Sequence, residues 1–152
     1  MTLYQHQKDV LQQTEKYNKV AYYLDMGLGK TYCGSYKATS FNKPILIICP
    51  KSLIPQWVEH FNDVHTEWGT YDLTKKKRLD EFMGDERINK VGIINYESAW
   101  RKPELLKLRD FTLMLDESQA IAILSIMYLH YLKKRVRSEE RRVGKECRSR
   151  WS

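Results

Sequence analysis

The chain is poor in the features that mark secreted or membrane-embedded proteins. It has three cysteines in 152 residues, at positions 33, 49 and 147, and their spacing matches no metal site. A small, odd number of cysteines favours a reducing compartment over a disulfide framework. The start of the chain is polar and has no signal-peptide core. The longest apolar-rich run, at 120–132, is shorter than the about 20 residues of a membrane span, so we expect a cytoplasmic protein with no membrane partner.

Internal repeats and low-complexity linkers are also missing from the sequence. Hydrophobic residues make up 42% of the chain, which is enough for the core of one ordinary domain and excludes a disordered composition. The formal net charge is +7. Such a basic balance is compatible with a nucleic-acid partner but does not establish one.

The segment RSEERRVGKECRSRWS, at 137–152, differs from the rest of the chain. It can be back-translated along its whole length into a common sequencing adapter, so we expect a non-native tail that takes no part in the fold. The alternative is a natural basic tail that binds nucleic acid. The tail holds six basic and three acidic residues, so the rest of the chain has a net charge of +4 instead of +7. Without the tail, the net charge is therefore weaker support for a nucleic-acid partner.

Apolar, strand-like segments alternate with helical ones along the remaining chain. The run PILIICP, at 44–50, is continuously apolar between prolines, which is typical of a strand buried on both faces. We expect further strands at 20–26, 90–97 and 111–118, and helices at 3–18, 30–39, 52–65 and 103–110. This alternation predicts an α/β fold with a parallel sheet flanked by helices.

The stretch AYYLDMGLGKTYCGS, at 21–35, predicts a phosphate-binding loop. Gly27 and Gly29 have no Cβ atoms to block a phosphate, and the following helix presents unpaired N–H groups at its N-terminus. Lys30 can reach the β- and γ-phosphates of a nucleotide, and Thr31 can place its hydroxyl on Mg²⁺. The strict phosphate-loop pattern has glycine where this chain has Leu24. The alternative is a simple strand-to-helix turn with an exposed lysine.

Two acidic residues follow the apolar stretch FTLML. A carboxylate at the C-terminal end of a parallel strand faces the crevice in which α/β proteins bind their ligands. Asp116 can hold Mg²⁺ directly or through water, and Glu117 can orient or deprotonate an attacking water. Alone, such a pair is often a solvated turn, but together with the phosphate loop it predicts nucleotide hydrolysis.

Five motifs in order resemble those of the Swi/Snf-type (Snf) DNA-dependent ATPases of helicase superfamily two. They are LYQHQ at 3–7, DMGLGKT at 25–31, ILIICPKSLIPQWVEHF at 45–61, VGIINYE at 91–97 and LMLDES at 113–118. In the third motif the matching residues are Pro50, Ser52, Gln56 and Trp57. The motif spacing and the stretch TYDLTKKKRL are also similar to those of compact phage and prophage members.

The resemblance implies a RecA-like lobe that binds ATP and Mg²⁺ and acts on duplex DNA. Gln7 would read the adenine, and the other nucleotide-binding residues would be Met26, Gly27, Leu28, Gly29, Lys30 and Thr31. The catalytic residues would be Lys30, Asp116 and Glu117, with the metal held by Thr31 and Asp116. The residues along the DNA backbone would be Lys51, Ser52 and Asn95.

The chain departs from this family after its fifth motif. Where the family has a histidine that couples hydrolysis to motion, this chain has Gln119. The apolar segment that follows does not match the family, and the sequence contains no second RecA-like lobe with its arginine for the γ-phosphate. We therefore expect an ATP-binding lobe at 1–118, a segment at 119–136 that a frame shift can explain, and the tail at 137–152.

Three functions stay open at this point. The parent protein can be a DNA-stimulated ATPase that moves on duplex DNA, or the motor lobe of a restriction enzyme. The chain as written can also be an inert nucleotide- or DNA-binding fragment, and by itself we expect it to hydrolyse ATP very slowly or not at all. Among the remaining residues, the basic run at 75–78 can touch DNA but more often forms a solvated helix face. Trp57 is expected to anchor the core, and Cys33 and Cys49 to be small buried residues.

Overall fold

The computed structural model describes residues 3–22 and 28–116, and its centre is a parallel β-sheet. Within these residues the sheet has four strands in the order β2-β3-β1-β4. The strands are β1 (Ile45–Cys49), β2 (Gly69–Asp72), β3 (Lys90–Asn95) and β4 (Thr112–Leu115). Every pairing among them is parallel, which confirms the predicted α/β class.

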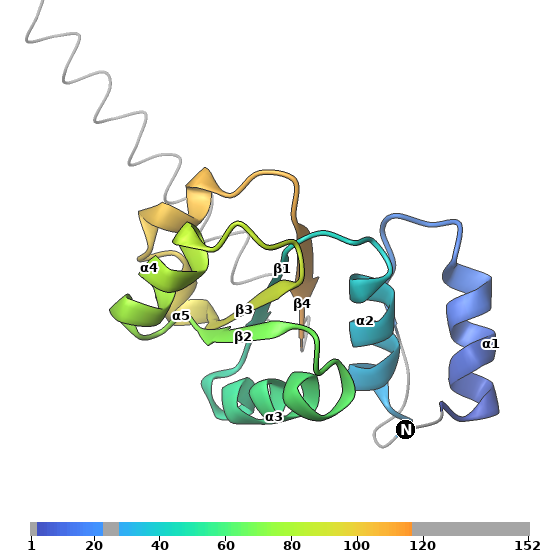
Figure 1. The fold of residues 1–152 in the computed structure, drawn as a ribbon. Coiled ribbons are helices and arrows are strands. Elements are labelled where there is room, and N and C mark those ends of the chain that lie inside the picture. The colour runs from blue at the N-terminus through green and yellow to red at the C-terminus, as the bar shows by residue number, and fades with distance from the viewer. Residues whose placement is uncertain (1–2, 23–27, 117–152) are drawn as a thin grey trace, which may run out of the picture. The chain divides into compact units, whose positions relative to one another are not determined.

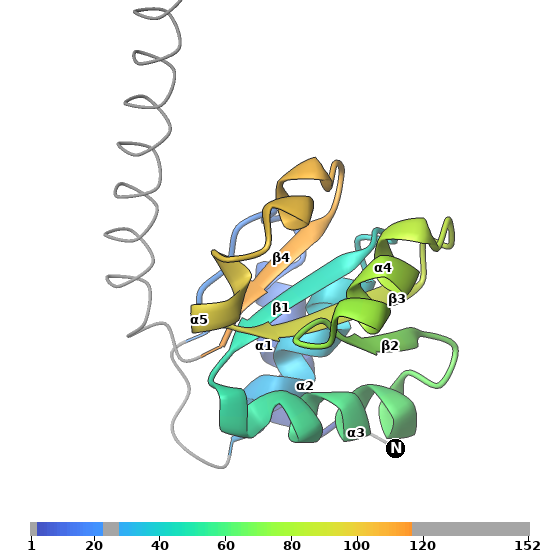
Figure 2. The same ribbon diagram turned by 90° about the vertical axis from the view of Figure 1, so that its left-hand side faces the viewer.

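Helices cover both faces of this sheet (Figure 1). The longer helices are α1 (Gln5–Thr14), α2 (Lys30–Thr39), α3 (Ile54–Val64) and α4 (Lys76–Gly84). Shorter turns of helix are α5 (Tyr96–Ala99), η1 (Lys51–Leu53) and η2 (Pro103–Lys107). Figure 2 shows α1 and α2 behind the sheet and α4 in front of it. No helix in the described parts of the chain is long and apolar enough to cross a membrane.

The alternation of side chains along β1 divides the core between the two faces. Ile45 and Ile47 belong to a cluster with Trp57 and Phe61 of α3, and this cluster also contains Ala38 of α2. On the opposite face, a Cβ atom at Gly92 would lie 2.6 Å from Leu73 Cδ1 and 3.1 Å from Phe82 Cζ. Glycine is therefore required there by the close packing of α4 on the sheet.

The strand expected at 20–26 is not found in its described part. Residues 20–22 have no strand structure, and 23–26 lie outside the described residues. The Tyr22 hydroxyl lies 3.1 Å from Thr14 Oγ1, so this tyrosine is tied to the end of α1 and not to a strand ladder. The other expected strands are present but shorter, and 96–97, expected as strand, begin α5.

Strand β2 was not expected from the sequence, and helix α4 was anticipated only as a solvated helix face at 75–78. The four residues of β2, GTYD, include glycine and aspartate, which are depleted in strands. The strand forms because it pairs with β3, from Gly69 opposite Lys90 to Asp72 opposite Ile93. Helix α4 contains most of the basic run at 75–78 and buries Leu79 and Phe82 on its inner side.

Candidate nucleotide site

The carboxyl ends of three parallel strands place polar residues along one edge of the sheet. Cys49 at the end of β1 is in register with Asn95 at the end of β3, and Ile48 is in register with Leu115 of β4. The backbone N–H of Asp116 donates to the carbonyl of Ile48 at 3.0 Å, which continues the pairing one residue beyond β4. Asp116 therefore lies at the carboxyl edge of the sheet, the edge at which parallel α/β folds bind their ligands.

Two aromatic side chains hold Asp116 in place. The Nε1–H of Trp57 donates to Asp116 Oδ2 at 2.8 Å, and the hydroxyl of Tyr96 donates to the Asp116 carbonyl. Trp57 is only 2% exposed, so its expected role as a core anchor is confirmed. A buried indole N–H needs an acceptor, and here the acceptor is the predicted metal ligand. No local pattern in the sequence indicates this contact, because it joins residues 59 positions apart.

Cys49 lies beside this carboxylate but has no reactive character. Burial, and secondarily the negative charge of Asp116, raise the pKa of the Cys49 thiol to about 12. Burial also raises the pKa of Cys33, which is fully buried in α2. Both cysteines are small buried residues, as expected from the sequence, and neither can act as a nucleophile at neutral pH.

Gln7, the predicted adenine reader, packs against the predicted phosphate loop. Its side chain is 4% exposed and is the only buried one in α1. The backbone N–H of Tyr4 donates to Gln7 Oε1 at 3.0 Å, and Gln7 Nε2 donates to the carbonyl of Leu28 at 3.4 Å. His6 Nε2 lies 3.3 Å from the same carbonyl. The side chains of the adjacent residues His6 and Gln7 thus both approach the carbonyl oxygen of Leu28.

Gly29 lets the side chain of Gln7 approach the backbone closely, and it is the N-cap residue of α2. Its φ of 78° lies in the left-handed region, and a Cβ atom there would lie 2.2 Å from Gln7 Nε2. Glycine is required at this position both for the backbone conformation and for the space. Lys30 follows as the first residue of α2 and is exposed, and the Thr31 side chain is half-buried in the same turn. A helix N-terminus with an exposed lysine suits an anion.

Three residues of the predicted site lie outside the described residues. They are Met26, Gly27 and Glu117. The structure places Gln7 against Leu28 and Gly29, and it places Asp116 between Trp57 and Tyr96. The nucleotide, metal and catalytic roles of all these residues stay predictions.

The residues expected along the DNA backbone differ in exposure. Lys51 and Ser52 are exposed in η1, directly after β1. Asn95 is 4% exposed, and its Nδ2 donates to Glu97 Oε2 at 2.6 Å. This hydrogen bond is the main cause that lowers the pKa of Glu97. Within the described residues, Asn95 Oδ1 has no hydrogen-bond partner. A direct contact of Asn95 with DNA stays a prediction.

The basic run at 75–78 is largely neutralised by neighbouring acids. Lys76 Nζ lies 3.1 Å from Asp80 and 2.6 Å from Glu104, and an Arg78 nitrogen lies 2.8 Å from Glu81. These pairs are exposed and contribute little to stability, but they reduce the positive potential of the run. The arrangement favours a solvated helix face over a DNA contact.

The predicted Mg²⁺ site has few protein ligands among the described residues. The described residues contain no cluster of three or more histidine, cysteine, aspartate or glutamate side chains that could hold a metal ion. Mg²⁺ characteristically binds one or two protein oxygens and takes its other ligands from phosphates and water. A single carboxylate at Asp116 and a hydroxyl at Thr31 fit that pattern.

Comparison with known proteins identifies the fold. No protein-family model matches the chain, and no curated protein matches it. Among solved structures, the chain is similar to the SWI2/SNF2 ATPase core of Sulfolobus solfataricus in complex with dsDNA, with a TM-score of 0.64 and 20% sequence identity. The match covers 80% of this chain and 27% of that one. The sheet and helices described above therefore have the RecA-like α/β fold.

Proposed function

We propose that residues 1–118 are the ATP-binding lobe of a Snf-type DNA-dependent ATPase. The observation that carries the proposal is the contact of Gln7 with the carbonyl of Leu28 and with Gly29. A base-reading amide and a phosphate-binding loop must lie side by side to hold one nucleotide, and the resemblance to the Snf-type ATPases implies both roles for these residues. The similarity of the fold to an ATPase core bound to dsDNA supports the same function.

In this proposal the nucleotide lies along the N-terminus of α2. Gln7 reads the adenine, and the loop from Met26 to Gly29 surrounds the phosphates. Lys30 neutralises the β- and γ-phosphates, while Thr31 and Asp116 hold the Mg²⁺ that completes charge compensation.

The carboxyl edge supplies the groups for hydrolysis. Trp57 donates to one oxygen of Asp116, so the orientation of this carboxylate is set before any ligand binds. Glu117, the next residue, orients or deprotonates the attacking water.

Duplex DNA is the proposed partner of the parent protein. Lys51 and Ser52 are exposed after β1 and can contact phosphates, which positions DNA without reading its sequence. The buried Asn95 can hold Glu97 in place through the hydrogen bond from its Nδ2 to Glu97 Oε2. Movement on DNA needs a second RecA-like lobe, and the proposal assigns that lobe to the parent protein.

By itself the chain is a slow or inactive ATPase. In this proposal the arginine that stabilises the γ-phosphate comes from a second lobe, and such a residue changes the rate of related reactions by about 10³ to 10⁵. An inert fragment is therefore the competing proposal. We assign 119–136 to a frame-shifted segment and 137–152 to a non-native tail in both cases.

Nucleotide binding by Lys30 variants tests the proposal. We expect the 152-residue chain to bind ATP weakly in the presence of Mg²⁺, and Lys30→Ala to abolish that binding in a calorimetric titration. Lys43→Ala is the matched control, because Lys43 is an exposed lysine paired with Asp110 after the end of α2. Equal ATP affinity in Lys30→Ala and the unmutated chain would show that the phosphate loop is misassigned.

A phosphate-release assay separates the slow enzyme from the inert fragment. The unmutated chain is compared with Glu117→Gln, with and without duplex DNA. A slow release that Glu117→Gln removes supports the ATPase lobe, and no difference between them supports the inert fragment. Strong stimulation by DNA would contradict the assignment of a single lobe.

A further inference from the structure

Helix α1 makes polar contacts with the rest of the lobe near both of its ends. Its only fully buried residue is Gln7, whereas its apolar residues Val10 and Leu11 are partly exposed. Apolar burial therefore holds this helix incompletely, so hydrogen bonds at its two ends contribute to where it lies.

Lys37 of α2 makes the contact at the C-terminal end of α1. Its side chain is 9% exposed, and its Nζ donates to the carbonyls of Thr14 and Glu15, each at 2.9 Å. The same ammonium group lies 4.9 Å from the centre of the Phe41 ring. Carbonyls in the last turn of a helix have no partner within the helix, and a cation there also interacts favourably with the helix dipole.

The contact at the other end of α1 is the one made by Gln7. Its amide meets Leu28 and Gly29, directly before α2 begins. Both ends of α1 are thus fixed to a single continuous segment, from Leu28 to Lys37. Thr14 lies seven residues after Gln7, which is about 10 Å along the helix axis. A release of the far end lets α1 pivot about its first turn.

We propose that Lys37 is a positioning residue that sets the base selectivity of the nucleotide site by fixing α1 and, through it, the amide of Gln7. The inference rests on the function proposed above. An amide distinguishes adenine from guanine only when its donor and acceptor are held in place, because the two bases present opposite hydrogen-bonding groups at the six-position. Lys30 and Thr31 lie in the first turn of α2, about two turns before Lys37, so we expect a substitution of Lys37 to affect them less than it affects Gln7.

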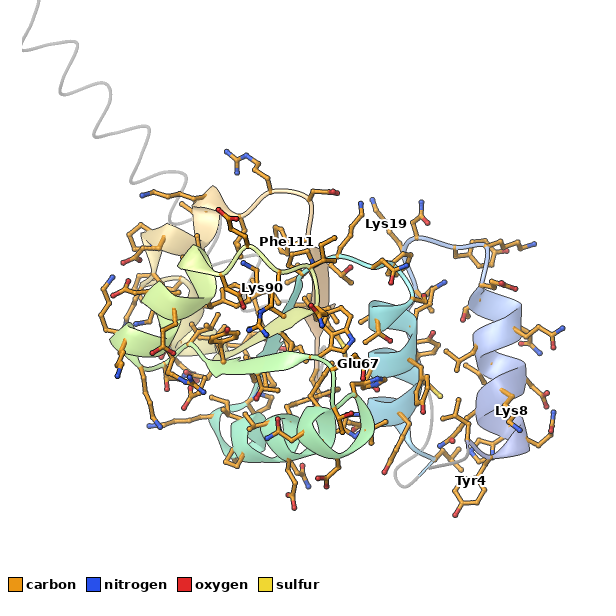
Figure 3. The ribbon with its side chains drawn as sticks, viewed as in Figure 1. Tyr4, Lys8, Lys19, Glu67, Lys90 and Phe111 are labelled. Atoms are coloured by element: carbon orange, nitrogen blue, oxygen red, sulfur yellow. The ribbon has the colours of Figure 1, made fainter. Side chains whose placement is uncertain are left out.

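Lys90 provides a matched comparison within the same chain. It is 7% exposed, and its Nζ donates to the carbonyls of Phe82, at 2.8 Å, and of Asp85, at the end of α4. Its ammonium group also lies 4.8 Å from an aromatic ring, that of Phe82. In Figure 3, Lys90 lies on the side of the sheet that carries α4, whereas Tyr4 and Lys8 mark the first turns of α1. The two lysines have the same chemistry, but only Lys37 is connected to Gln7.

The test is the ratio of ATP to GTP affinity, measured by calorimetric titration of the 152-residue chain. We expect Lys37→Met to weaken ATP by about tenfold, the effect of one misplaced hydrogen bond, and to leave GTP within about twofold. Lys37→Arg, which keeps a cation and its donors, should restore most of the preference for ATP. Lys90→Met should lower the melting temperature and leave the ratio unchanged in the folded protein.

A second variant separates this inference from the function on which it rests. If the unmutated chain binds ATP and GTP equally well, or Gln7→Ala keeps the preference, the adenine-reading role of Gln7 is wrong. If Gln7→Ala removes the preference and Lys37→Met keeps it, Lys37 has no positioning role. In the Gln7→Ala background, Lys37→Met should change the ratio no further. A further change there would also overturn the inference, because Lys37 would then act by another route.

Discussion

The two faces of the sheet are stabilised in different ways. The face under α4 is closed by apolar side chains, with Leu73, Leu79 and Phe82 fully buried over Gly92. The opposite side combines the apolar cluster around Trp57 and Phe61 with a polar network, in which Ser35 Oγ of α2 lies 2.8 Å from His60 Nε2 and 3.0 Å from His65 Nε2. Among the described residues, the buried polar residues Gln7, Ser35, Lys37 and His65 belong to α1–α3 and the end of α3, whereas Lys90 is the one on the side that carries α4.

This difference follows the placement of the candidate site. An apolar face tolerates no change in geometry without a loss of contact, so it gives the sheet a rigid support. Hydrogen-bonded networks specify the positions of the elements that they join and depend on the protonation of their members. The helix that begins at the phosphate loop contributes Ser35 to this network, so we expect the stability of this side to be more sensitive to pH than that of the side under α4.

The largest expected effect comes from opening the apolar face. Phe82→Ala should lower the free energy of unfolding by about 3 to 5 kcal/mol, because a fully buried ring is removed. Chemical denaturation measures the loss. Leu113→Ala is the control, since Leu113 is 50% exposed and its truncation should cost less than about 1 kcal/mol. A small effect of Phe82→Ala would show that α4 is not a rigid support.

The polar face should instead be sensitive to acid. Burial, together with the neighbouring His65, lowers the pKa of His60 to about 4, and burial lowers the pKa of His65 as well. The unfolded chain therefore binds more protons than the folded one between about pH 6.5 and pH 4, and stability is lost as pH falls through that window.

We expect the free energy of unfolding to fall by about 2 to 3 kcal/mol from His60 alone between pH 7 and pH 4. Denaturation curves across this range, compared with those of His60→Gln, isolate the contribution from other groups. Parallel curves for the two proteins would mean that the pKa of His60 is the same in the folded and the unfolded chain.

A smaller loss of stability is expected from a substitution of Trp57, whose indole N–H reaches Asp116 at the carboxyl edge of the sheet. Trp57→Phe removes the N–H that donates to Asp116, and should cost about 1 to 2 kcal/mol of stability. It should also weaken the effect of Mg²⁺ on ATP binding, since Asp116 loses its orienting partner. Trp68→Phe, another buried tryptophan of the same cluster, should leave the effect of Mg²⁺ unchanged.

We expect the tail at 137–152 to have no effect on the packing of either face of the sheet. Deletion of 137–152 should leave the melting temperature unchanged and reduce only non-specific binding to DNA, since the segment carries six basic residues. A clear loss of stability in a thermal melt would show that the tail is native structure.

The sequence predicted the parts of the fold that local pattern determines. The apolar run of β1 and the helix after the glycine loop were found because each is recognisable within ten residues. Strand β2 was missed because its residues have low strand propensity and it exists only through pairing with β3.

Within the candidate site, the neighbourhood of Gln7 and the loop agreed with the family resemblance, whereas the Trp57–Asp116 contact was not anticipated. It joins a helix to the end of a strand, and no spacing along the chain encodes such a meeting. The buried network of Ser35, His60 and His65 was missed for the same reason. Both require the tertiary structure to bring distant polar groups together.

The burial of Cys33 and Cys49 has a practical consequence for fluorescence experiments. With a pKa of about 12, on the order of one Cys49 side chain in 10⁴ or fewer is a thiolate at neutral pH, and both sulfurs are shielded from reagents. In a chain shortened to remove 137–152, a cysteine introduced at the exposed Lys51 would be the one readily labelled thiol among the described residues. A single dye could then report contact with DNA without replacement of the two native cysteines.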